Sequence, residues 1–441
     1  MNQDSNCSMV AVELDWPRYM EQRFRERPRL LRQTASNGLC CIFRVPRSVF
    51  VGDPKAYEPQ IVSIGPYHRG KEQVEMLEQH KPRLFAALLD RTRGHGAPAE
   101  AYFRTMASVE TKIRECYSED LDCGSWSLIE MMILDACFVV EMFRVTASLV
   151  PADPADPLFS MPWVYSFLTL DLLLIENQIP FFVLETVFEL SMAPTEAHYS
   201  LNKLALEFFN YRLRRPQHEL ERHYHVPNVT HLLDLFRLSL VGHLELEDPG
   251  DVNEEFLQLI PSAKQLLLAG IKLKPRKSDR FIDVRFERGV LQIPPLTLDV
   301  FTRSLFLNCI AYEQCSCYCS KHITTYAVLM SCVVSTAADA ALLSEHNIIV
   351  NFSGSDEYVA RYFNNLTCGV SFDISISYLA GLFGEVTRYH QNKWHVQWSG
   401  IKREYFGSPW SFISAVAAFI LLALTVVQAF YAVYAYYRPS K

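Results

Sequence analysis

The stretch SFISAVAAFILLALTVVQAFYAVYA, residues 411–435, decides how the rest of this chain is interpreted. No Asp, Glu, Lys or Arg occurs from Tyr405 to Tyr437. As a helix rising about 1.5 Å per residue, residues 411–435 would be about 37 Å long, more than the roughly 30 Å of a bilayer core. A buried core helix is the alternative, but such helices seldom run this long without a charge. We therefore predict a single C-terminal transmembrane helix.

Aromatic residues flank this segment on both sides. Trp410 precedes it, Tyr434 and Tyr437 lie at its far end, and Arg438 follows. Tyr and Trp concentrate at the two interfaces of a bilayer, so these four residues are predicted to anchor the helix. Residues 405–437 are assigned to the membrane helix and residues 438–441 to a short tail.

The composition of the chain argues against some classes of function. The 441 residues include 42 Lys and Arg against 49 Asp and Glu, a net charge of −7. A nucleic-acid binder needs a concentrated basic face, so no nucleic-acid partner is expected. The twelve cysteines are irregularly spaced, which favours reduced thiols facing the cytosol, although an even number leaves pairing open.

Apolar residues at helical spacing predict helices upstream of the membrane segment. One strand pair stands out, because Ile282, Val284 and Phe286 alternate with polar residues and Arg288-Gly289 can turn the chain into residues 290–293. The predicted fold is mainly α, a helical globular domain with one small β-hairpin. The predicted helices span residues 73–91, 101–117, 127–149, 163–190 (broken at Pro180), 201–213 and, with interruptions, 298–343.

The chain is divided by changes in composition. Residues 214–261 contain clustered His and then an acidic patch with Pro and Gly, so they are predicted to form a variable, exposed insertion. The predicted parts are an N-terminal arm (1–38), a helical N-terminal lobe (39–213), the insertion (214–261) and a C-terminal lobe with the hairpin (262–404).

Polar residues inside apolar segments are the best candidates for sites. Asp171, Glu176 and Asn177 lie in one such segment, and Asp135 lies in another. Carboxylates near a core must be paired or neutralised, and Arg44, His68 and Lys81 are suitable partners. Paired carboxylates can perform acid–base chemistry, but no nucleophile or metal motif accompanies these. All seven are therefore predicted to be structural polar anchors, with catalysis as the alternative.

No metal or cofactor is predicted. His218 and His223 are five residues apart, so a helix would not place both on one face, although His225 and His231 follow nearby. The cluster Cys315, Cys317 and Cys319 is spaced too closely for a usual structural zinc site, and unpaired thiols are favoured over zinc or a redox pair.

Several ordered motifs resemble the plant family called domain of unknown function 247. They are CIFRVP (41–46), YEPQIVSIGPYH (57–68), EQHK (78–81), EMMILD (130–135), DLLLIENQIPFF (171–182), IPPL (293–296), GSD (354–356) and NKW (392–394). The resemblance implies a plant protein that ends in one membrane helix and has no established enzymatic activity. Some grass members of that family are linked to self-incompatibility as candidate recognition determinants.

These observations predict a membrane-anchored, non-enzymatic protein that acts in recognition or signalling through a protein partner. A membrane-associated enzyme, such as a hydrolase using the buried carboxylates, is the alternative. The domain is expected on the cytosolic side, because no signal peptide precedes it. Three glycosylation sequons, at Asn228, Asn351 and Asn365, favour the opposite orientation.

Overall fold

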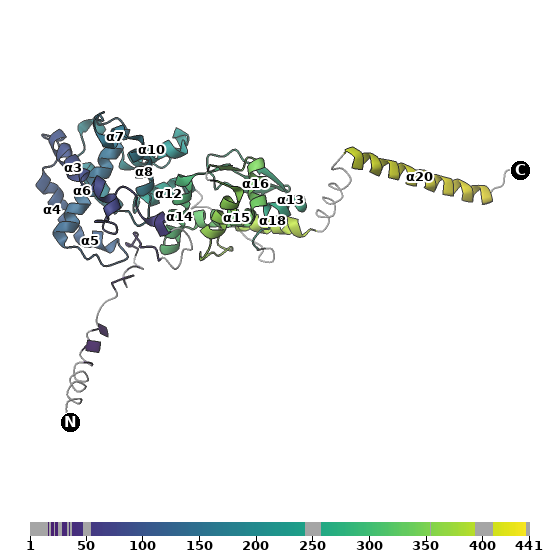
Figure 1. Ribbon diagram of the computed structural model, residues 1–441, viewed down its shortest axis with the longest axis horizontal. Coiled ribbons are helices and arrows are strands. Elements are labelled where there is room, and N and C mark those ends of the chain that lie inside the picture. The colour runs from purple at the N-terminus through teal and green to yellow at the C-terminus, as the bar shows by residue number, and fades with distance from the viewer. Residues whose placement is uncertain are drawn as a thin grey trace, which may run out of the picture. The chain divides into compact units, whose positions relative to one another are not determined.

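The computed structural model describes residues 54–242, 257–352, 354–392 and 409–437, together with residues 16, 19–21, 23–24, 29–32, 35 and 38–46. Most of the predicted N-terminal arm, the acidic patch of the insertion and Arg438 lie outside these residues. The chain divides into two compact units (Figure 1). The first contains residues 1–242 and 301–321, and the second contains residues 243–300 and 322–441.

A central helix, α6 (Ser125–Thr146), organises the first unit. Every residue from Leu128 to Arg144 is buried except Glu130 and Leu134. A helix that is apolar on all sides needs neighbours on all sides. Here α3 (His80–Arg91), α4 (Ala99–Ser108), α9 (Phe181–Leu190) and α10 (Leu201–Leu213) pack against it.

Shorter elements complete the first unit, and the predicted mainly helical fold is confirmed. They are the 3₁₀ turns η2 (Pro54–Tyr57), η3 (Glu72–Val74) and η4 (Pro194–Glu196), and the helices α2 (Glu75–Glu78), α5 (Glu110–Glu115), α7 (Pro157–Ser160), α8 (Pro162–Asp171), α11 (Gln217–Glu221), α12 (Leu232–Val241) and α14 (Val300–Cys315).

The predicted helix over residues 163–190 ends earlier than expected. Helix α8 stops at Asp171, and residues 172–180 are irregular before α9 begins at Phe181. The apolar run suggested a helix up to Pro180, but tertiary hydrogen bonds hold this segment in another conformation.

Part of the predicted exposed insertion is buried. Within residues 214–261, α12 buries every residue except Leu238 in the first unit. Its apolar residues follow one another so closely that no wide polar face remains for solvent. The acidic residues 243–256 lie outside the described chain.

The second unit contains two small sheets. Strand β3 (Val290–Ile293) pairs antiparallel with β2 (Arg285–Glu287) and parallel with β1 (Lys272–Pro275). The predicted hairpin is confirmed in β2 and β3. Arg288 and Gly289 have φ values of 51° and 76°, the left-handed values that a two-residue type I′ turn requires. A parallel pair, β4 (Leu296–Leu298) and β5 (Ile349–Asn351), was not predicted, because its strands have only three residues each.

The second unit also contains the helices α13 (Ala263–Leu268), α15 (His322–Val333), α16 (Ala337–Glu345), α17 (Asp356–Leu366) and α18 (Ala380–Gln391). Of these, α13 packs against β1, α16 against β5 and α18 against β2.

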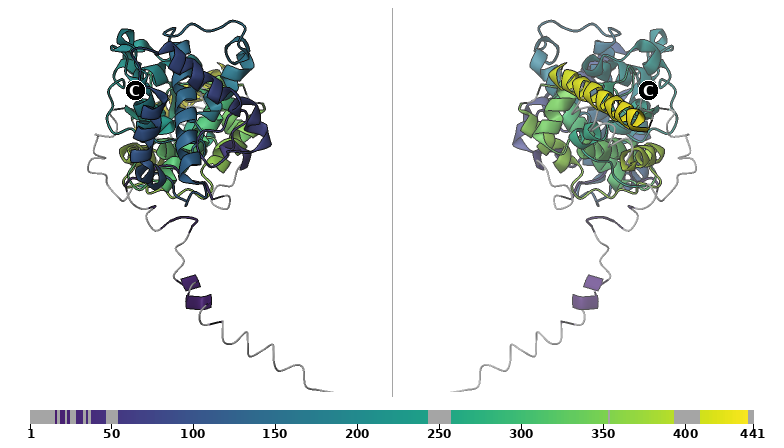
Figure 2. Two further views of the ribbon diagram at one scale, coloured as in Figure 1. Left: turned by 90° about the vertical axis from the view of Figure 1, so that its left-hand side faces the viewer. Right: turned by 90° about the vertical axis from the view of Figure 1, so that its right-hand side faces the viewer.

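The apolar C-terminal segment is one helix, α20 (Pro409–Tyr437), drawn in yellow as an unbroken rod in Figure 2. Residues Val416–Tyr434 have a mean hydropathy of 2.3, and none of this window is buried. By length and composition, α20 could span a membrane.

Candidate functional site

Two largely irregular segments of the first unit, residues 56–69 and 171–180, are joined by buried side chains, and we call them the buried loop pair. Buried irregular backbone is unusual because its N–H and C=O groups need partners that regular structure would otherwise supply. In the loop pair, those partners are mostly polar side chains.

Asp171, the last residue of α8, is fully buried and binds the first loop. Its carboxylate accepts backbone N–H bonds from Gln60 (2.9 and 3.0 Å), Ile61 (2.8 Å) and Val62 (3.1 Å). Burial raises the pKa of Asp171 to about 6, and the three N–H donors oppose that rise. The carboxylate therefore serves as the acceptor for a turn of otherwise unpaired backbone.

Asn177 continues the connection between the two loops. Its Oδ1 accepts the N–H of Ile64 at 2.7 Å, and its Nδ2 donates to the carbonyls of Val62 at 3.1 Å and Asp171 at 2.9 Å. One amide thus binds both segments with donor and acceptor groups that a carboxylate could not supply.

Asp135 brings α6 into the same network. Its Oδ2 accepts the N–H of Gly65 at 2.7 Å, and its Oδ1 accepts a bond from Lys81 Nζ at 2.6 Å. Lys81 also donates to Ser63 O and to the carboxylate of Glu78. The three donors of this buried ammonium group are therefore all used, as burial of a charge requires. Burial also raises the pKa of Glu78.

Gly65 is required where the loop passes closest to its partner segment. Its φ is 82°, and a Cβ at this position would lie 2.6 Å from Gln178 O and 3.1 Å from Tyr117 Oη. Only a residue without a side chain can both adopt this conformation easily and allow that approach.

Glu176 binds two further parts of the unit. Its Oε1 accepts the N–H of Val45 at 2.8 Å, and its Oε2 lies 3.2 Å from His68 Nε2. Arg44, predicted as another partner of these carboxylates, lies elsewhere. It is partly exposed, pairs with Glu119 at 2.9 Å and lies over the ring of Tyr67. The structure thus brings six of the seven predicted polar residues together and places Arg44 at the surface.

Two buried polar residues of the first unit were not predicted. Asn308 of α14 accepts the N–H of Ile175 at 2.9 Å and donates to Ala56 O at 3.2 Å. Arg144 of α6 is fully buried and pairs with Glu141 at 3.0 Å and Glu196 at 2.9 Å. A polar residue within an apolar helix was the available signal in both cases, as it was for Asp135.

A cavity of about 500 Å³ opens beside the network. Its wall includes Lys81, Asp135, Glu78 and Glu130. Both oxygens of Asp135 are already bonded, so little of its capacity remains for a ligand.

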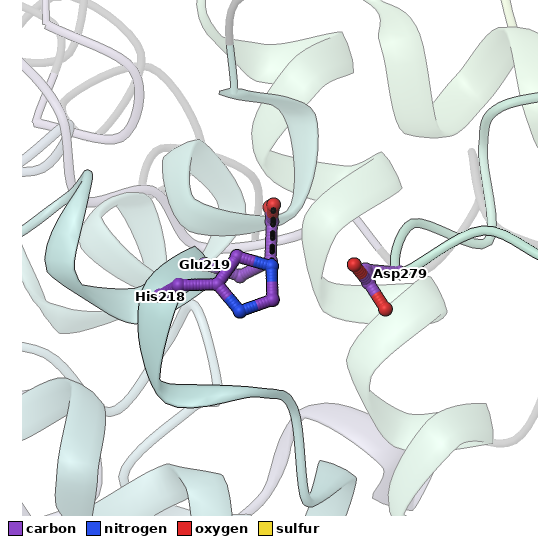
Figure 3. Close-up of side chains that lie close together, drawn as sticks. All are labelled: His218, Glu219 and Asp279. Atoms are coloured by element: carbon purple, nitrogen blue, oxygen red, sulfur yellow. Dashed lines mark ion pairs between the residues drawn. The ribbon is translucent and has the colours of Figure 1, made fainter.

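The sequence predicts no metal at either the His cluster or the Cys cluster. In α11, His218 Nε2 lies 3.7 Å from Glu219 Oε1 (Figure 3). Asp279, also drawn there, belongs to the second unit. His231 is fully buried and caps α12. None of the cysteines in the described part of the chain forms a disulfide, and Cys317 is exposed.

Comparison with known proteins identifies the family of this chain. The family model DUF247, described as plant protein of unknown function, matches residues 42–424. The chain belongs to the DUF247 family. This confirms the resemblance found in the motifs, all of which lie within or at the edge of the matched range.

Two relatives of this chain come from Arabidopsis thaliana. UPF0481 protein At3g47200 is 36% identical over 435 residues, covering 94% of this chain and 90% of the relative. A second UPF0481 protein, At3g02645, is 22% identical over 488 residues, covering 88% of this chain and 89% of the relative. No solved structure matches this chain.

Proposed function

We propose that α20 anchors this DUF247 protein in a membrane and that the preceding helical units act as an interaction module without catalysis. The observation that carries the proposal is α20 itself. It has 29 residues, its window has a mean hydropathy of 2.3, and its described side chains are exposed. A water-soluble fold would bury such a helix, whereas a bilayer solvates it.

The aromatic residues at the ends of α20 support the same proposal. Trp410 is 79% exposed at one end, and Tyr434 is 49% exposed near the other. Phe430 and Tyr434 stack at a centroid distance of 6.2 Å. Rings in these positions suit the headgroup region on the two sides of a bilayer.

Carbonate extraction of membranes from plant cells that express the full chain tests the anchor. The full chain should stay in the membrane pellet, whereas the variant L421R/L424R should be released. Each arginine at the centre of the helix costs about 2.5–3.5 kcal/mol on insertion. Release of the unaltered chain by carbonate would overturn the proposal.

The buried polar residues support a scaffold rather than an active site. Asp171 binds three backbone N–H groups, and both oxygens of Asp135 are occupied.

The proposed ligand of this module is a protein partner, bound through the acidic residues 243–256. Affinity purification with this segment intact and then deleted tests the idea, since a specific partner should be lost with the deletion.

A membrane-associated hydrolase is the second candidate, and one observation favours it. The cavity beside the loop pair contains Glu78, whose pKa is raised by burial, next to Lys81 and Asp135. A raised carboxyl pKa in a cleft is typical of general acids. Any hydrolytic activity of the purified chain that Glu78→Gln abolishes without lowering its melting temperature would support this candidate over the scaffold.

A further inference from the structure

Cys41 and Cys116 bring two buried thiols together from positions 75 residues apart. Cys41 lies in the N-terminal segment 38–46, and Cys116 follows α5 at its C-terminal cap. Both are buried, with exposed fractions of 5% and 4%.

The backbone fixes the distance between these two residues. Cys116 O accepts the N–H of Cys41 at 3.0 Å and that of Ile42 at 2.9 Å, and Ile42 forms a parallel bridge with Tyr117. Bridged chains run about 4.8 Å apart, which lies within the Cα separation of about 4.4–6.8 Å found in disulfides.

The two side chains also influence each other. Each thiol shifts the pKa of the other, so that the pKa of Cys41 is raised and that of Cys116 is lowered. The Cys116 thiol donates a hydrogen bond to Lys112 O at 3.3 Å, which fixes the position of its sulfur. The nearby cation of Lys112 favours the Cys116 thiolate, which is the nucleophilic form.

We propose that Cys41 and Cys116 form a redox-responsive pair that peroxide converts to a disulfide. The Cys116 thiolate attacks one oxygen of hydrogen peroxide, the O–O bond breaks, and the released hydroxide takes up a proton to become water. Cys116 is then a sulfenic acid. The sulfur of Cys41 attacks this sulfur, the S–O bond breaks, and the hydroxyl leaves as water with the Cys41 proton. Two thiols and one peroxide thus give one disulfide and two water molecules.

The disulfide would attach the N-terminal segment covalently. In the reduced chain, backbone hydrogen bonds and the bond from Val45 N–H to Glu176 hold this segment in place. A bond that closes a loop of this length restricts the unfolded chain strongly. The oxidised chain should therefore melt roughly 5–10 °C higher than the reduced chain.

The test uses the full chain purified in detergent and treated with hydrogen peroxide. Digestion with trypsin and Glu-C under non-reducing conditions yields the peptides 33–44 and 116–119, so Cys116 is separated from the other thiols. Mass spectrometry should detect these two peptides as a linked pair in the unaltered chain. The melting temperature should rise on oxidation and return to its starting value with dithiothreitol.

Cys40 provides the matched control, because it is an adjacent buried thiol in the same peptide. The linked pair should persist in Cys40→Ser and vanish in Cys41→Ser and Cys116→Ser. Absence of the pair from both the unaltered chain and Cys40→Ser would overturn the proposal, even if the other variants fail to fold. Persistence in Cys41→Ser would also overturn it, since Cys40 would then be the partner.

Discussion

Asp171 shows how one side chain can determine the path of a distant loop. Its carboxylate is the acceptor for the N–H groups of Gln60, Ile61 and Val62. Leaving buried donors unpaired costs about 1–3 kcal/mol each, so Asp171→Ala should destabilise the chain by about 3–5 kcal/mol. Urea unfolding of the full chain in detergent measures this change.

The conservative variant provides the comparison. In Asp171→Asn, the amide oxygen can replace Oδ2, which accepts from Ile61 and Val62, so the loss should be much smaller. Equal losses of stability in Asp171→Ala and Asp171→Asn would show that the negative charge of Asp171, and not its acceptor oxygens, stabilises the loop.

The raised pKa of Asp171 also predicts how the stability of the chain changes with pH. The folded value of about 6 exceeds the unfolded value of about 4. Its contribution to stability is therefore fully present below pH 4 and is lost as the pH rises through 6. Asp171→Asn should lack this decrease when unfolding is compared between pH 4 and pH 7.

Gly65 and Gly70 form a matched pair of glycines. Both have left-handed φ values, 82° and 83°, but a Cβ at Gly65 would lie against Gln178 O, whereas a Cβ at Gly70 would meet no other atom within 4 Å. Gly70→Ala should cost about 1 kcal/mol through backbone strain alone. Gly65→Ala should cost at least about 2 kcal/mol more, because the close contact adds to that strain. Similar melting temperatures for the two variants would contradict the proposed role of the close approach.

At the level of elements, α12 begins at an unusual cap. His231 Nδ1 accepts the N–H of Asp234 at 3.1 Å, and Nε2 lies 3.1 Å from Cys41 O. This arrangement requires the neutral ring with its proton on Nε2, since a protonated ring would direct a second N–H at the N–H of Asp234. The cap therefore binds α12 to the N-terminal segment only while His231 is neutral.

Acid should weaken this connection. Burial lowers the pKa of His231 to about 4, with Asp234 opposing the shift and Arg237 adding to it. Because the folded pKa lies below the unfolded value of about 6.5, the contribution is present above pH 6.5 and is lost as the pH falls through 4. The free energy of unfolding should therefore fall by about 3 kcal/mol between pH 6.5 and pH 4.

The variant His231→Asn isolates that contribution. Asn can still cap the helix but cannot titrate, so its stability should vary less between pH 7 and pH 4 than that of the unaltered chain. Denaturant unfolding of both proteins at the two pH values measures the difference. Parallel pH profiles for the two proteins would exclude His231 as the titrating group.

At the level of the whole molecule, the proposed membrane anchor can be oriented in two ways, with the two units on either side. We predict the cytosolic side, and the sequons at Asn228 and Asn365 provide the test because both side chains are exposed. Glycans are added to such sites only in the secretory pathway. The plant-expressed protein should therefore keep its electrophoretic mobility after treatment with an N-glycosidase. An increase in mobility that Asn228→Gln and Asn365→Gln abolish would place the units outside the cytosol.

The sequence alone determined the features that depend on local pattern. The apolar run 411–435 predicted α20, the alternation around Arg288-Gly289 predicted the hairpin of β2 and β3, and residues 201–213 predicted α10. The motifs of the buried loop pair predicted the family. A charge or amide in an apolar segment needs a partner, and this rule pointed to the six of the seven predicted polar residues that lie together in the structure.

Tertiary structure alone decided which partner each group has and where helices stop. Residues 172–180 have the composition of a helix, yet they are irregular because side chains bond their backbone: Gln178 donates to the carbonyls of Leu172 and Leu174, and Asn308 accepts the N–H of Ile175. The cap at His231 and the pairing of Cys41 with Cys116 join positions 190 and 75 residues apart. Local periodicity carries no information about such contacts, because they form only when distant segments are brought together by burial of the common core.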